Sequence, residues 1–198
     1  MKSHLIRTLV FICSFIFFYS CDLGFQEAGQ NPEGKSRLII RLTDAPGDYQ
    51  EVIVELVGLK VHSLEEGWID MEQFQSGTYD LLELQNGVEA ILVDEPFPSG
   101  AITEFRLLLG ENNTIKVDDE VLPLRTPGAQ QSGLKIKVQA IIEGGEEYSI
   151  LLDFDAEKSI HMAGRSGSYM LRPVIKAIMP DGTEFLNDDD DDDDNDDN

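Results

Sequence analysis

The chain has 198 residues, of which 15 are basic and 38 are acidic, and its formal net charge is −23. A protein with this much negative charge repels nucleic acid and anionic lipid head groups. The composition therefore argues against nucleic-acid binding. A chain of this length is sufficient for one domain with an extensive hydrophobic core.

The first twenty residues have the features of a secretory signal peptide. Lys2 and Arg7 precede an apolar run over residues 8–19, and Ser20 and Cys21 follow that run. A charged start before an apolar run of about 7–15 residues is typical of an export signal, and a membrane-spanning helix would need about 20 apolar residues. A cysteine directly after a small residue at this point resembles the lipobox of bacterial lipoproteins.

The lipobox resemblance implies that residues 1–20 are removed and that acyl chains such as palmitate are attached to Cys21. Two or more acyl chains anchor a protein stably, so we expect a membrane anchor in the cell envelope. We expect this anchor to lie at the outer membrane. An ordinary secreted protein and an uncleaved anchor are the alternatives. Cys13 would leave with the signal, so no disulfide or cysteine-based metal site could form within the mature chain.

Two segments lack the apolar pattern of a folded domain. Residues 21–35 are rich in glycine and polar residues, which predicts a flexible tether. Residues 187–198 are almost entirely Asp and Asn, and so dense a run of like charge predicts a disordered acidic tail. Without residues 1–20 the net charge is −25, and without the nine tail aspartates as well it is −16. The domain is therefore predicted over residues 36–186 and is itself acidic.

Within this domain, apolar side chains recur at every second position, as in strands with one buried and one exposed face. The clearest runs are 37–42, 104–109, 134–142, 148–154 and 169–177. Turn-forming Gly, Pro, Asn and Asp separate the runs. No segment predicts a long amphipathic helix, although short helical turns are expected around 79–84 and 155–161.

The alternation changes phase within residues 51–62. One phase holds Val52, Val54 and Leu56, and the other holds Val57, Leu59 and Val61. A β-bulge at Gly58 would keep both halves facing the core. Pro173 interrupts the last apolar run, which favours an edge strand or a bulge there. Seven to nine strands with frequent turns predict an all-β fold, a two-sheet antiparallel sandwich that is transthyretin-like or immunoglobulin-like.

Several short motifs follow one another along the domain. They are Leu42-Thr-Asp-Ala-Pro-Gly47, Gly67-Trp68, Tyr79-Asp-Leu-Leu-Glu-Leu84, Gln130-Gln-Ser-Gly-Leu134, Leu152-Asp-Phe-Asp-Ala156 with Ser159-Ile160, and Tyr169 to Ile178. In this order they resemble a bacterial and archaeal family named only as domain of unknown function 4382, over about residues 36–180. The resemblance implies an exported, often lipid-anchored β-sandwich and supplies no biochemical role.

Three aspartates are candidate site residues. Asp44 follows the first strand and could bind a cation or a sugar hydroxyl, although an Asx-type turn before Pro46 is the plainer interpretation. Asp153 and Asp155 bracket Phe154 and would project to one side of their strand. Such a pair could hold calcium or serve a calcium-dependent hydrolase, but capping of the turn at 156–160 is favoured. Calcium is thus the one cofactor for which the sequence offers even weak ligands.

Other catalytic patterns are missing from the sequence. His62 and His161 are the only histidines beyond the predicted signal, and neither belongs to a His-x-x-x-His or Glu-x-x-His pattern. No Gly-x-Ser-x-Gly nucleophile elbow occurs. We therefore expect a binding or structural protein of the envelope and no enzymatic activity.

Aromatic and basic residues supply the remaining candidates for ligand binding. Trp68, the sole tryptophan, could stack on a sugar ring, but burial in the core is favoured because sandwich cores often bury one tryptophan. Eight of the thirteen basic residues after the signal fall at predicted outward positions, namely Arg37, Arg41, Arg106, Lys116, Lys135, Lys137, Arg172 and Lys176. They could form a basic face for acidic glycans, or a solvated face that discourages edge pairing. In the leading interpretation the loops of the sandwich contact a glycan or another envelope protein, and an accessory carbohydrate-binding module is the second interpretation.

Overall fold

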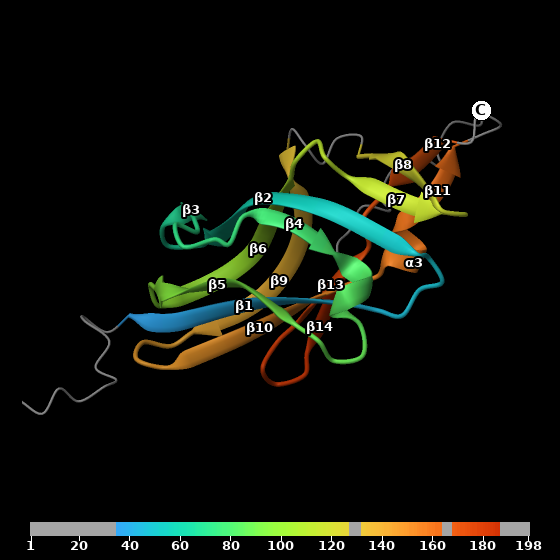
Figure 1. The fold of residues 1–198 in the computed structure, drawn as a ribbon. Coiled ribbons are helices and arrows are strands. Elements are labelled where there is room, and N and C mark those ends of the chain that lie inside the picture. Colours follow the sequence, from blue (N-terminus) through green and yellow to red (C-terminus); the bar gives the residue numbers. More distant parts are fainter. Residues whose placement is uncertain (1–34, 127–131, 164–167, 187–198) are drawn as a thin grey trace, which may run out of the picture. The chain divides into compact units, whose positions relative to one another are not determined.

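The computed structural model describes residues 35–126, 132–163 and 168–186 (Figure 1). The predicted signal, Cys21, the tether up to residue 34 and the acidic tail lie outside the described residues. Within the described ranges, no helix is long and apolar enough to span a membrane.

Two β-sheets make up the described part of the chain. The five-stranded sheet, in the order β14-β13-β10-β1-β5, contains β1 (Ser36–Asp44), β5 (Ala90–Phe97), β10 (Glu147–Phe154), β13 (Ile175–Ile178) and β14 (Glu184–Leu186). The nine-stranded sheet contains β2 (Glu51–Ser63), β3 (Gly67–Asp70), β4 (Gly77–Asp80), β6 (Gly100–Leu109), β7 (Thr114–Val117), β8 (Glu120–Arg125), β9 (Leu134–Ile142), β11 (Ile160–Ala163) and β12 (Ser168–Leu171). Its main path is β11-β12-β8-β7-β2-β6-β9, and β3 and β4 also pair with β2.

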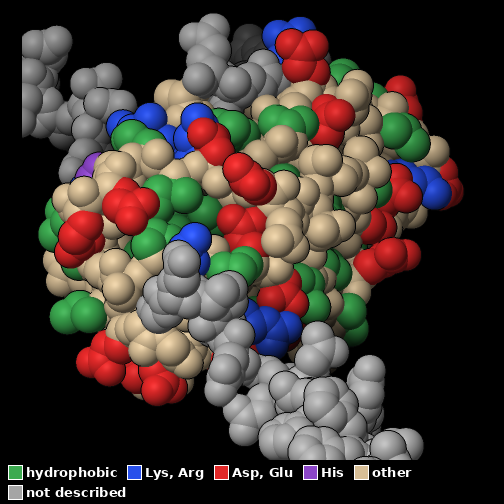
Figure 2. Space-filling view, turned by 90° about the vertical axis from the view of Figure 1, so that its left-hand side faces the viewer, with side chains coloured by type: hydrophobic (Ala, Val, Ile, Leu, Met, Phe, Trp, Pro, Cys, Tyr) green, Lys and Arg blue, Asp and Glu red, His purple; other side chains and the backbone are tan. Residues whose placement is uncertain are grey.

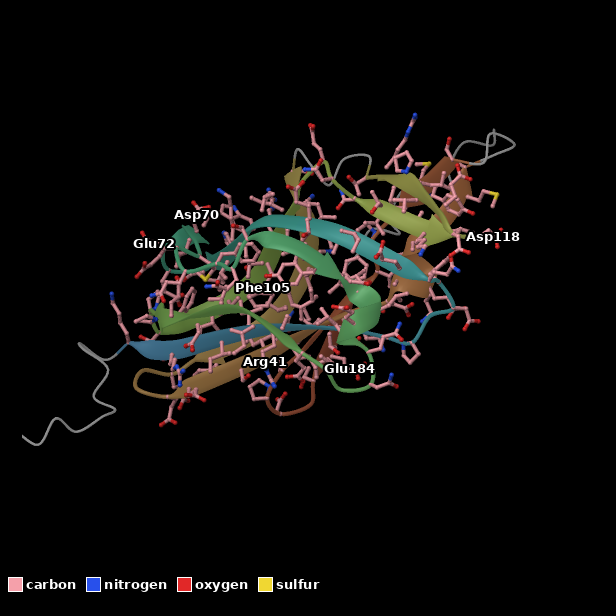
Figure 3. All side chains as sticks on the ribbon, viewed as in Figure 1. Arg41, Asp70, Glu72, Phe105, Asp118 and Glu184 are labelled. Atoms are coloured by element: carbon pink, nitrogen blue, oxygen red, sulfur yellow. The ribbon has the colours of Figure 1, made fainter. Side chains whose placement is uncertain are left out.

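The core forms where the apolar faces of these strands meet. Alternate side chains of β1, β6, β9 and β10 are buried, as the period of two predicts. Phe105 of β6 is fully buried and is labelled among the interior side chains in Figure 3. The all-β, sandwich-like class predicted from the sequence is thereby confirmed, and the described strands outnumber the seven to nine expected.

The predicted bulge in β2 is present. The pairing of β2 with β6 shifts register between Leu56 and Gly58, so that Leu56 pairs with Leu109 and Gly58 with Leu108. Leu59 and Val61 are buried beyond the shift, as predicted, but Val57 is 48% exposed because it is the extra residue of the bulge. Placing Val57 in the core was therefore wrong.

The two sheets are mixed, whereas antiparallel pairing throughout was predicted from the sequence. β1 runs parallel to β10, and β12 runs parallel to β8. Parallel neighbours cannot be joined by a hairpin, so their pairing depends on contacts between segments distant in the chain. β1 and β10 are separated by about a hundred residues, and no local pattern encodes that distant pairing.

Pro173 marks a change of sheet. The run predicted as one last strand is divided into β12, in the nine-stranded sheet, and β13, in the five-stranded sheet. Proline has no N–H to donate to a ladder, so the strand ends beside it. Buried Ser159 holds this crossover, because its carbonyl accepts from the Arg172 N–H and its hydroxyl accepts from the Val174 N–H at 2.8 Å. The edge-strand and bulge interpretations of Pro173 were both wrong.

Two short helices occupy the predicted turn regions. The 3₁₀ helix η2 (Leu81–Leu84) begins after Asp80, whose carboxylate accepts from the Leu82 N–H. The α-helix α3 (Ala156–Ser159) begins after Asp155, which caps it in the same manner. Both helices bury apolar or small side chains against the core, so each closes a connection between strands.

Replacement of Phe105 should test the core directly. Phe105→Ala removes a fully buried ring between the sheets and should lower the free energy of unfolding by about 3–5 kcal/mol. Val121→Ala, at an exposed position of β8, should change it by less than about 0.5 kcal/mol. Urea unfolding followed by circular dichroism measures both values, and a cost below about 1 kcal/mol for Phe105→Ala would contradict this core.

Candidate functional site

The parallel pairing of β1 with β10 brings the three candidate aspartates to one end of the five-stranded sheet. Thr43 pairs with Asp153 and Asp44 pairs with Phe154, so Asp44 lies beside the residues that lead into α3. The negative charges of Asp153 and Asp155 are close enough to raise the pKa of Asp44. Parallel neighbours place their carboxyl ends at the same sheet edge, which the sequence alone could not specify.

Asp44 is buried and linked to two distant segments. Asp44 is only 4% exposed. Its Oδ1 accepts from the Ala156 N–H at 2.9 Å, and its Oδ2 accepts from Gln85 Nε2 at 3.2 Å. Burial raises the pKa of Asp44 to about 6, although both hydrogen bonds lower it. These contacts join β1 to the start of α3 and to the loop after η2, so Asp44 acts over long range rather than in an Asx turn.

Asp153 and Asp155 have different surroundings. Burial would raise the pKa of Asp155, but the Lys158 ammonium and backbone N–H, at 2.6 Å and 2.9 Å from its carboxylate, hold that pKa below its usual value. Burial raises the pKa of Asp153, and the Lys176 ammonium partly opposes this effect. Asp155 is thus the N-cap and ion-pair partner within α3, as the capping interpretation expects.

This aspartate cluster is arranged as a structural junction. Among the described residues, no three His, Cys, Asp or Glu side chains are grouped so that they could hold a metal ion. The oxygens of Asp44 and Asp155 already accept from neighbouring N–H groups, so they bind the protein's own backbone. His62 and His161 lie on β2 and β11.

A second cluster lies on the outer face of the nine-stranded sheet, and we name it the Trp68 patch. It comprises Trp68 of β3, Lys60 and His62 of β2, Arg106 of β6, and Lys135 and Lys137 of β9. Strand register arranges them in two rows: Asp70–Lys60–Arg106–Lys135 and Trp68–His62–Glu104–Lys137. Neighbouring strands are about 4.8 Å apart, so each row brings its side chains together within a short span.

Trp68 forms the aromatic centre of this patch. The Arg106 guanidinium lies over its ring at 4.5 Å from the centroid, and the His62 ring meets it edge-on with centroids 4.8 Å apart. A cation this close to an indole face is attracted by the ring quadrupole. Trp68 is 40% exposed, so the expectation of a buried core tryptophan was wrong. Trp68 lies on β3, which pairs with β2, and the alternation along β3 leaves Trp68 and Asp70 exposed.

The eight basic residues do not form one face. Arg37 and Arg41 lie on β1 and Lys176 on β13, whereas Arg106 and Lys135 lie on strands of the other sheet. Arg37 is bound by Asp94 and Glu147, and Arg41 by Glu89, so these cations are largely neutralised. Figure 2 shows acidic side chains spread over one face, with Lys and Arg gathered in smaller groups.

Two members of the Trp68 patch were not predicted from the sequence. Lys60 was left out of the basic set, and His62 was considered only as a zinc ligand. Once the bulge at Gly58 is recognised, Leu59 and Val61 point inward, so the alternation places both Lys60 and His62 on the outer face. The position of β3 beside them could not be read from local sequence.

Comparison with known protein families identifies the domain that carries both clusters. Residues 35–173 match the family described as "Domain of unknown function (DUF4382)". The chain belongs to this family. No curated protein matches the chain. The matched residues of the DUF4382 domain include the whole Trp68 patch and all three candidate aspartates.

Asp44 should make the stability of the DUF4382 domain depend on pH. Its pKa is about 6 in the folded state and lower when unfolded, so its contribution to stability is fully present below about pH 4 and is lost as pH rises through 6. Asp44→Asn keeps an oxygen for the Ala156 N–H. Relative to this variant, the free energy of unfolding of the wild type should fall by roughly 2–3 kcal/mol between about pH 4 and pH 7.

Urea unfolding at a series of pH values measures this difference. Asp48→Asn serves as the control, because it removes the same charge from an exposed position in the loop after β1. The difference in the free energy of unfolding between wild type and this control should vary by less than about 0.5 kcal/mol over the same pH range. If the difference in the free energy of unfolding between wild type and Asp44→Asn were equally independent of pH, burial would not govern the pKa of Asp44.

Proposed function

We propose that this protein is a lipoprotein of the cell envelope, held by acyl chains on Cys21, whose DUF4382 domain has a non-catalytic binding or structural role. The proposal is supported at the N-terminus by the charged start, the short apolar run and the cysteine that follows it. The glycine-rich residues 21–35 would then give the domain reach from the membrane surface. We place the anchor at the outer membrane.

The observation that most favours a binding role is the exposed Trp68 patch. Large aromatic side chains are usually buried in sandwich domains, and an exposed tryptophan beside arginine is typical of recognition surfaces. The aspartate cluster, by contrast, is occupied by contacts within the domain. The surface of β2, β3, β6 and β9 is therefore the side of the domain that we assign to partners.

An accessory carbohydrate-binding module is the second candidate, and the exposure of Trp68 favours it. A flat sheet face with one accessible indole ring can pack against the apolar face of a sugar ring. His62 lies beside the ring, and its Nδ1 is 2.7 Å from the Thr103 hydroxyl, so this side of the patch offers polar groups for sugar hydroxyls. In this interpretation the partner is a glycan of the envelope or its surroundings.

Lipid attachment is tested by Cys21→Ser in the full chain expressed in a lipoprotein-processing bacterium. The wild type should be found in the membrane fraction with acyl chains on its mature N-terminus, because at least two chains are needed for stable anchoring. Cys21→Ser should lose the acyl mass and leave that fraction. Intact-mass spectrometry with and without globomycin, which blocks lipoprotein signal cleavage, measures the difference.

Cys13→Ser is the matched control, since Cys13 lies inside the predicted signal and would be removed with it. This variant should have the same mature mass and the same membrane fractionation as the wild type. Acyl mass that persists in Cys21→Ser, or a wild-type mass that is unchanged by globomycin, would refute the lipoprotein proposal.

A further inference from the structure

We infer that the Trp68 patch binds an acidic polysaccharide of the polyuronate type, with a sugar ring against Trp68 and its carboxylate on Arg106 and Lys135. This inference rests on the proposed binding function and specifies its ligand class. A polyuronate presents an apolar ring face and one carboxylate on each sugar. The patch presents the complementary arrangement, with an indole ring beside a row of cations.

Like charges stand directly opposite one another in the Trp68 patch. Lys60 pairs with Arg106, and Arg106 pairs in turn with Lys135, so three cations lie in one row across β2, β6 and β9. Like charges at directly opposed positions destabilise a sheet. A ligand carboxylate would turn that repulsion into attraction, whereas a purely structural face would be more stable with opposite charges there.

These cations are only partly neutralised by neighbouring carboxylates. Lys60 is 2.9 Å from Asp70, and Arg106 donates from Nε to Glu104 at 2.8 Å. Within the described ranges, the Nη groups of Arg106 have no hydrogen-bond acceptor, and Lys135 has no ion pair. The patch thus retains a guanidinium edge and an ammonium group that can bind a carboxylate through charge-assisted hydrogen bonds.

Cations are concentrated in the Trp68 patch relative to the rest of the domain. The four cations of the patch are a third of the twelve basic residues in 36–186, a segment that holds twenty-six acidic residues. The Debye length is about 8 Å at physiological ionic strength, so a bound carboxylate senses the patch more than the distant acids. The overall negative charge would repel a long anionic polymer elsewhere on the domain, which restricts binding to this surface.

The apolar part of the surface extends beyond Trp68. The Leu64 N–H donates to the Ala101 carbonyl, and Ala101 pairs with Ile141, so exposed Leu64 and Ile141 form a further row on the same outer face. Apolar side chains therefore flank the aromatic row on one side, and the three cations flank it on the other. A chain of sugars lying along the strand direction would cross these rows and contact both kinds of side chain.

Binding is measured by isothermal titration calorimetry with the full chain in detergent micelles. Polygalacturonate is the acidic probe and dextran is the neutral one, and EDTA removes divalent cations that could bridge two anionic polymers. The wild type should bind polygalacturonate and not dextran, and its affinity should fall roughly tenfold between about 50 mM and about 500 mM NaCl, because salt screens exposed charges. Lys135→Gln and Trp68→Ala should each weaken binding by roughly five- to tenfold.

Lys116→Gln is the matched control. It removes the same charge from β7, where Lys116 lies near Asp119 and pairs in register with Glu51, at the other end of β2 from Lys60. Figure 3 shows the same separation, with Asp70 and Asp118 labelled at opposite ends of the sheet. Lys116→Gln should bind as the wild type does, and all variants should have wild-type urea midpoints.

Equal binding of dextran, or equal weakening by Lys116→Gln and Lys135→Gln, would overturn the acidic ligand class. Failure of both polymers to bind would overturn this inference and the carbohydrate-binding candidate together. Neither result bears on the anchor, because the Cys21→Ser experiment decides lipid attachment separately. Polygalacturonate binding that is lost in both patch variants and kept in the control would support the assignment.

Discussion

The alternation of side chains along β2, β6 and β9 is the constraint on which the domain depends. Burial of every second residue drives the two sheets together, and the residues between them are forced onto the outer face. Phe105 and its neighbour Arg106 therefore have opposite environments, one in the core and one against Trp68. Because a register slip of one residue would exchange the two faces, core packing also fixes the composition of the patch.

Charge is distributed unevenly over this scaffold. On the five-stranded sheet, Arg37 and Arg41 are neutralised by nearby carboxylates, and at the end of β1 the buried Asp44 accepts hydrogen bonds from two other segments. On the outer face of the nine-stranded sheet, Arg106 and Lys135 are opposed in register. The first sheet thus pairs Arg37 and Arg41 with carboxylates, whereas on the second sheet Arg106 is paired through Nε alone and Lys135 is exposed. This contrast is the physical basis for assigning recognition to the Trp68 patch.

Local sequence predicted the local features. Period-two alternation identified the long strands, the phase change at Gly58 identified the bulge, and both short helices lie where helical turns were expected. Features set by distant contacts could not be predicted in this way. The parallel pairing of β1 with β10, the change of sheet at Pro173 and the link from Asp44 to Ala156 each join segments that no short pattern relates.

The candidate site shows the same division. Outward positions of Arg106, Lys135 and Lys137 follow from alternation, but their place on one face with Trp68 depends on strand order. A rule drawn from other sandwiches placed the tryptophan in the core, because burial of one large aromatic is common there. Here β3 is short and pairs only along the end of β2, so Trp68 and Asp70 are exposed while Ile69 packs against the core.

Ionic quenching of tryptophan fluorescence tests the account most directly, since Trp68 is the only tryptophan in the chain. Iodide is attracted to cations and caesium to anions, so their relative quenching reports the charge next to the indole ring. The patch predicts that iodide quenches Trp68 more strongly than caesium does, despite a net charge of −23, and that Lys135→Gln reduces this excess. Stronger quenching by caesium, or no quenching by either ion, would contradict an exposed tryptophan among cations.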